Sequence, residues 1–62
     1  MTKIELRQLI EIDMPEFEKG QCKESVVRSR LQQYKTHFGK DMWYEDYVFR
    51  YNKVVEERKL TI

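Results

Sequence analysis

Large apolar side chains recur at helical spacing in the last third of the chain. At about 100° per residue, one arc roughly 140° wide collects an aromatic and β-branched stripe. Its members are Trp43, Tyr44, Tyr47, Val48, Tyr51, Val54 and Val55. Arg58 is the one charged residue inside this arc, and the other charges of the segment lie opposite. The pattern predicts an amphipathic helix over 41–58, with Asp41 as its N-cap.

A second apolar stripe occupies the middle of the chain. Val27, Leu31, Tyr34 and Phe38 follow one another at spacings of four, three and four residues. This spacing predicts a helix over 22–38, and Gly39 supplies the residue type that most often ends one.

The first segment opens with a helix-start signal. Thr2 and Glu5 have the spacing of a capping box, and Leu6, Leu9 and Ile10 share one face. A helix over 3–12 is predicted, and a short strand is the alternative because β-branched residues alternate there. A second start signal at 13–16, with Pro15 in its first turn, predicts a separate helical turn over 14–19 that bears Phe17.

These elements predict an all-α fold, a single three-helix domain over 1–62 with short turns and a possible helix-turn-helix-like arrangement. We expect the last two helices to form an antiparallel or angled hairpin capped by the first. The predicted core comprises Leu6, Leu9, Ile10, Phe17, Val27, Leu31, Tyr34, Phe38, Trp43, Tyr47, Val48, Tyr51, Val54 and Val55. With 62 residues, such a core rarely supplies more than about 3–5 kcal/mol, so a partner or self-association would help.

Composition argues against catalysis. One Cys, Cys22, and one His, His37, cannot form a zinc site, and the two Gly residues lie too far apart for a phosphate-binding loop. We therefore expect no enzyme activity, no cofactor, no metal and no small-molecule substrate. No apolar run could span a membrane, and residues 1–13 do not resemble a signal peptide. With a lone Cys, a cytoplasmic location is expected.

The net charge of +1 conceals a segregated distribution. Residues 19–40 carry six basic side chains and one acidic side chain, between two acidic segments. This basic block could meet phosphate or an acidic protein surface, or it could pair with the chain's own acidic ends.

Phe49 and Met42 lie off the apolar arc of the last predicted helix, among charged residues. Exposed aromatic residues beside Arg are typical of protein-binding surfaces. The predicted protein-binding residues are Met42, Phe49, Arg50 and Lys53. The function expected first is a small regulatory or inhibitory protein that binds another protein, or itself as a homodimer. The alternative is that Phe49 packs beneath the first helix or the residues at 60–62.

A second functional hypothesis is DNA binding by the basic helix. The turn at 14–19 followed by the helix over 22–38 loosely suggests a helix-turn-helix, although Gln21 and Glu16 depart from that pattern. The candidate DNA-binding residues are Lys23, Arg28, Ser29, Arg30, Gln33 and Lys35. A transcription or recombination regulator would follow from this alternative.

Overall fold

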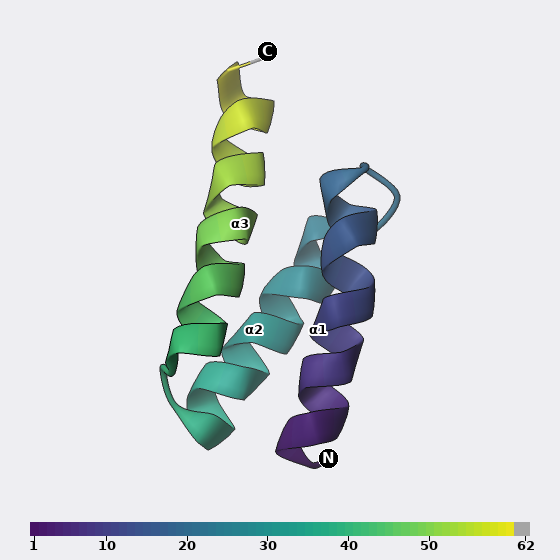
Figure 1. Cartoon of the computed structure of the whole chain (residues 1–62). Helices are drawn as coiled ribbons and strands as arrows, with labels where there is room; N and C mark the ends of the chain where they lie inside the picture. The colour runs from purple at the N-terminus through teal and green to yellow at the C-terminus, as the bar shows by residue number, and fades with distance from the viewer. Residues whose placement is uncertain (61–62) are drawn as a thin grey trace.

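Three helices make up the fold, and the computed structural model describes them within residues 1–60. They are α1 (Lys3–Glu18), α2 (Glu24–Phe38) and α3 (Met42–Leu60). The chain runs up α1, back down α2 and up again along α3, so its two ends lie at opposite ends of the molecule (Figure 1). The predicted all-α, three-helix fold is confirmed, and residues 1–60 contain no strand. α3 continues to Leu60, two residues past its predicted end, and residues 61–62 lie outside the described part.

α1 runs without interruption through Pro15, so the predicted division into a helix over 3–12 and a turn over 14–19 is wrong. A proline inside a helix costs about 3 kcal/mol, because it cannot donate a backbone hydrogen bond and its ring crowds the preceding turn. Met14 and Phe17, on either side of it, are both fully buried. Each such side chain contributes about 1.5–3 kcal/mol, so their burial outweighs the cost of the proline.

The helix ends follow the sequence signals closely. The backbone N–H of Glu5 donates to Thr2 Oγ1 over 3.2 Å, which is the first half of the predicted capping box. The second half differs, since Glu5 accepts from the Thr2 hydroxyl over 3.1 Å. Gly20 and Gly39 both have φ of 83°, a positive value that glycine adopts at little cost. α2 begins two residues later than predicted, at Glu24.

The buried core is smaller than predicted and draws on different positions of α3. Its fully or nearly buried side chains are Leu6, Ile10, Met14, Phe17, Val27, Leu31, Tyr34 and Tyr44. Met14 and Tyr44 are absent from the predicted core. Leu9 is only half-buried. The other predicted members are partly buried against the core: Phe38, Trp43, Tyr47, Val48, Tyr51, Val54 and Val55.

Tyr34 lies at the centre of the aromatic packing. Its ring stacks on Tyr44 with centroids 5.8 Å apart and lies 5.0 Å from Trp43 and 5.4 Å from Phe38. A second contact, 5.5 Å between the rings of Phe17 and Tyr51, joins the end of α1 to the middle of α3. Aromatic pairs at these separations add about 0.5–1.5 kcal/mol beyond their burial.

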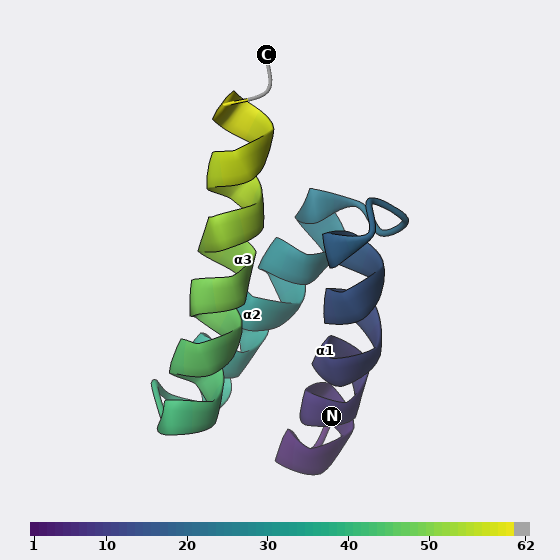
Figure 2. The same ribbon diagram turned by 45° about the horizontal axis from the view of Figure 1, so that its top comes forward.

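α3 packs less closely than the other two helices. The contact between α1 and α2 is the most extensive in the molecule, whereas the sequence predicts α2 and α3 as the main hairpin. The last turns of α3 extend past the ends of α1 and α2 in both views (Figures 1 and 2). None of the helices within residues 1–60 combines the length and the apolar character that crossing a membrane requires.

Candidate functional site

One face of α3 points away from the core along its whole length. Its residues recur at alternating spacings of four and three, the repeat of a helix-pairing surface. We call this face the outer stripe, and it consists of Met42, Asp46, Phe49, Lys53, Glu56 and Leu60. All six side chains are exposed. The apolar members are 85% exposed at Met42, 69% at Phe49 and 86% at Leu60.

The exposure of Phe49 argues against packing beneath α1, the first of the two alternative positions named for it, and residues 61–62 lie outside the described part. A phenylalanine packed beneath α1 would be largely covered, whereas Phe49 keeps most of its surface in water. Leu60 is itself exposed and does not cover it. Beside Phe49 lies an open hollow of about 270 Å³, lined also by Glu18, Arg50, Lys53, Val54 and Glu57. Phe49 therefore stands at the edge of a shallow surface depression.

Arg50, predicted to bind a partner, is engaged within the chain. Its Nε and one terminal nitrogen donate to the two carboxylate oxygens of Glu18 over 3.0 and 2.6 Å. This bidentate contact lowers the pKa of Glu18 and raises that of Arg50. The guanidinium also lies 5.1 Å from the ring centroid of Tyr47. Arg50 thus fixes the end of α1 against α3, while Lys53 remains exposed on the outer stripe.

The candidate DNA-binding residues do not all share one free surface. Arg30 turns toward α1, where its Nε lies 3.4 Å from Asp13 Oδ2. These two atoms have no other polar partner, so each balances the other's charge without an ideal hydrogen bond. The remaining five are exposed on α2 or just before it: Lys23, Arg28, Ser29, Gln33 and Lys35. The basic block is therefore partly paired with the chain's own acidic residues and partly open to solvent.

Among residues 1–60, the largest pKa shift is that of Asp41, which lies between α2 and α3. Tyr34 donates to Asp41 Oδ2 over 2.6 Å, and Arg7 donates to the same oxygen over 3.0 Å. The backbone N–H of Tyr44 donates to Oδ1 over 2.8 Å, and Lys3 Nζ lies 3.3 Å away. These donors, Tyr34 foremost, hold the pKa of Asp41 well below its ordinary value of 3.8. Because the carboxylate caps α3 and joins all three helices, its role is structural.

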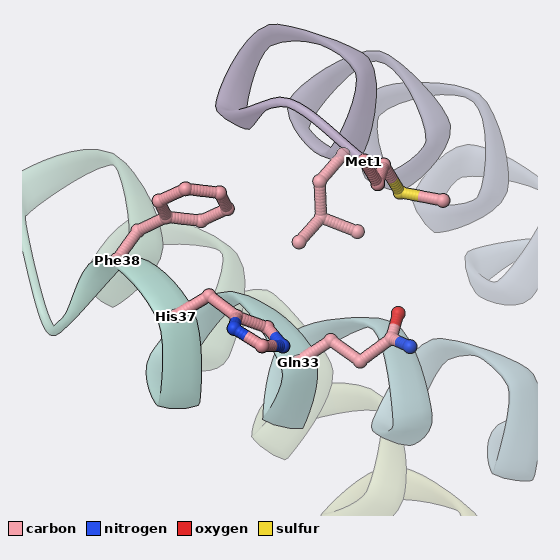
Figure 3. Close-up of a pocket in the computed structure, with 5 residues that line it drawn as sticks. Met1, Gln33, His37 and Phe38 are labelled. Carbon is pink, nitrogen blue, oxygen red and sulfur yellow. The ribbon is translucent and has the colours of Figure 1, made fainter.

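An open hollow of about 470 Å³ separates the first turn of α1 from the last turns of α2 (Figure 3). Leu6 lines it together with Met1, Gln33, His37 and Phe38. Figure 3 shows the ring of Phe38 and the side chain of Met1 on opposite sides of the opening. Leu6 is almost fully buried, whereas His37 is exposed. Among the side chains that line this hollow, only His37 is titratable, so the lining contains no acid–base pair.

Cys22 and His37 do not meet. The half-buried Cys22 precedes α2, where its Sγ lies 3.7 Å from the carbonyl oxygen of Lys23, and His37 lies near the opposite end of the helix. Within residues 1–60, His, Cys, Asp and Glu side chains form no group of three or more that could hold a metal ion.

Sequence reasoning missed Leu60 as a member of the outer stripe, because it ended the helix at 58. The signal was present, since Leu60 follows Phe49 by eleven residues and so returns to the same side of a helix.

Comparisons with known proteins identify no relative of this chain. No protein-family model matches the chain, and neither the curated proteins nor the solved structures include a match.

Proposed function

We propose that this chain is a small non-catalytic regulatory or inhibitory protein that binds another protein through the outer stripe of α3. The observation that carries the proposal is the exposure of Phe49, 69%, on the helix face opposite the core. Burying a phenylalanine is worth about 1.5–3 kcal/mol, a large share of what so small a core supplies. In the isolated chain Phe49 is exposed and contributes little to stability, whereas a partner that covers it would gain this burial free energy.

The shape of the outer stripe favours a protein partner over a small molecule. It is the convex face of a helix beside a shallow open hollow, whereas small-molecule sites are concave and enclosing. Helices that bind proteins in this way present apolar anchors at three-, four- and seven-residue spacing to a groove on the partner. Met42 and Phe49 are seven residues apart, with Lys53 four residues further on. The charged members between the anchors supply the polar surround of such a contact.

A capture experiment with matched variants tests the proposal. The purified chain is immobilised and exposed to an extract of its source cells, and retained proteins are quantified for wild type, Phe49→Ser and Ile12→Ser. Ile12 is the matched control because it is 64% exposed on α1. We expect proteins retained by wild type and Ile12→Ser to be lost with Phe49→Ser, while all three chains keep the same urea midpoint. Equal retention by all three chains would refute the assignment of the outer stripe.

DNA binding by α2 remains the second candidate, supported by the exposure of Lys23, Arg28 and Lys35. Its support is weaker, because Arg30 is held by Asp13 and the neighbouring helix α1 is acidic. A fluorescence-anisotropy titration with a mixed-sequence duplex decides between the two. Phosphate contacts would give affinity that falls steeply between about 50 and 200 mM salt and weakens in Arg28→Ala. Absence of salt-dependent binding would remove this candidate.

A further inference from the structure

The charges of the outer stripe are arranged so that the stripe complements itself. Between Phe49 and Leu60 the repeat reads apolar, basic, acidic, apolar: Phe49, Lys53, Glu56 and Leu60. Reversing the direction of a helix reverses this order. A second copy laid antiparallel therefore presents Leu60 opposite Phe49 and Glu56 opposite Lys53.

We propose that the outer stripe pairs with the outer stripe of a second copy of this chain, antiparallel, over residues 49–60. This inference rests on the proposed function and names the partner as the chain itself. Each pair occurs twice by the two-fold symmetry, which is the rule for a closed dimer. Two Phe49–Leu60 contacts then enclose two Lys53–Glu56 ion pairs.

Other alignments of the same stripe are less favourable. An antiparallel pairing shifted by one seven-residue repeat would set Phe49 against Lys53 and Asp46 against Glu56, which brings two carboxylates together. A parallel pairing would oppose every charged residue to its own copy. Like charges at facing positions of paired helices destabilise the pair. Within residues 49–60, this alignment alone matches each charge of the stripe with its opposite and each apolar residue with another.

The shape of the molecule leaves this part of α3 accessible. The last turns of α3 extend past the ends of α1 and α2 in both views (Figures 1 and 2), and the outer stripe is exposed from Phe49 to Leu60. The half-buried Tyr51, Val54 and Val55 face the molecule's own core. In the dimer the two α3 helices therefore lie at the centre, and the α1–α2 pairs lie on the outside.

The contact is short, so the dimer should dissociate on dilution. Four layers of facing residues fall at the low end of interface sizes, where complexes are weak and transient. Sedimentation velocity from about 10 μM to about 1 mM covers the corresponding range of dissociation constants. We expect the mass to rise from the monomer value of 7.7 kDa toward twice that value.

Charge-swap variants test the alignment. Lys53→Glu and Glu56→Lys should each weaken the dimer about fivefold to tenfold, because each replaces two opposite-charge contacts with like-charge contacts. The double variant Lys53→Glu/Glu56→Lys should regain the wild-type dissociation constant. An equimolar mixture of the two single variants should form a mixed dimer more readily than either alone. Ile12→Ser is the matched control and should leave the dimer unchanged, because Ile12 is 64% exposed on α1, outside the outer stripe.

Each outcome bears on the inference separately from the proposed function. A dimer insensitive to both single variants, or one weakened by Ile12→Ser, would overturn the alignment. A strictly monomeric chain at about 1 mM would overturn self-pairing altogether. If the monomeric chain still captured other proteins through Phe49, the protein-binding function would stand without the dimer. All variants replace exposed side chains, and circular dichroism with urea confirms that each remains folded.

Discussion

The phenolic hydroxyl of Tyr34 donates a 2.6 Å hydrogen bond to the carboxylate of Asp41, seven residues further along the chain. Tyr34 is fully buried in α2, and Asp41 caps α3 through the backbone N–H of Tyr44. Arg7 of α1 donates to both residues, over 3.0 Å each. One ionised carboxylate thus joins all three helices, and the stability of the fold should depend on its protonation.

The fold should lose stability in acid because Asp41 must be protonated there. The pKa of Asp41 is depressed in the folded state below its ordinary value of 3.8, which the unfolded chain retains. The stabilisation is therefore complete above about pH 4 to 5 and declines as the pH falls further, toward the lower folded value. Urea unfolding at a series of pH values from about 7 to 2, followed by circular dichroism, measures this decline.

Asp41→Asn separates this contribution from that of Glu18, whose pKa is also lowered. The variant keeps the size of the side chain but cannot lose a charge at position 41. We expect it to be less stable than wild type at pH 7 and to show a smaller further loss in acid. A variant whose loss between neutral and acid pH equalled that of wild type would show that Asp41 is not the group responsible.

Removing only the hydroxyl of Tyr34 should destabilise the chain measurably. Tyr34→Phe leaves Asp41 without its shortest hydrogen bond and Arg7 Nε without its partner, at an expected cost of about 1–3 kcal/mol. The expected observation is a lower urea midpoint with an unchanged denaturant slope. Tyr51→Phe is the matched control, because Tyr51 is only half-buried and its hydroxyl lies outside this network. Equal effects of the two substitutions would contradict the special role of Tyr34.

Leu31→Ala should unfold the chain at room temperature. Leu31 is 5% exposed at the centre of α2, and truncating a buried leucine costs about 2–5 kcal/mol. That cost is comparable with the total of about 3–5 kcal/mol expected of a core this small. Thermal melting by circular dichroism should show no cooperative transition, while Ile12→Ala, on the solvent side of α1, should melt like wild type. A cooperative melt of Leu31→Ala would show that the core is larger than these eight buried residues imply.

The fold class and most helix ends followed from local signals in the sequence. The caps at Thr2 and Asp41 and the glycines at 20 and 39 act within a few residues, so their effect is readable without tertiary structure. The continuity of α1 was missed because Pro15 was weighed as a local signal. The apolar spacing of Leu6, Ile10, Met14 and Phe17 crosses it without interruption, and tertiary burial decided the outcome.

The candidate site was less predictable, because it depends on which long side chains pair across helices. The sequence identified Met42, Phe49 and Lys53 as lying opposite the apolar arc, and the structure leaves all three exposed. The sequence could not show that Arg50 would form an ion pair with Glu18 of α1 rather than with Asp46, four residues earlier on α3. Ion pairs between residues 32 positions apart leave no periodic trace in a sequence.

Arg58, the one charge within the apolar arc of α3, should be stabilising. Its guanidinium lies 4.5 Å from the ring centroid of Phe17 and donates to the Phe17 carbonyl oxygen over 3.0 Å. It thus supplies a cation at the C-terminal end of α1, whose own last turn has no basic residue. We expect Arg58→Ala to cost about 1–2 kcal/mol and Arg58→Lys to recover only part of it, because a lysine does not stack like a guanidinium. Urea midpoints of the three chains give the comparison, and an unchanged midpoint in Arg58→Ala would refute it.

Pro15→Ala should stabilise the chain, which provides a direct test of the continuous first helix. Alanine restores the backbone N–H that Pro15 cannot donate to the carbonyl of Glu11, and it removes the crowding of the ring. Proline in turn restricts the unfolded chain, which offsets about 0.4–1 kcal/mol of the gain. We therefore expect a net increase of about 2–2.6 kcal/mol in the unfolding free energy, measured by urea titration.

Pro15→Ala would not raise the unfolding free energy if Pro15 occupied the first turn of a separate helix. There the missing N–H has no intrahelical partner to lose, and the fixed backbone angle of proline favours the helix start. Alanine would then be neutral or destabilising.

A second variant, Met14→Ala, distinguishes the two arrangements independently. In the continuous helix Met14 is fully buried, so its truncation should cost about 2–5 kcal/mol, whereas a residue in an exposed turn would tolerate alanine.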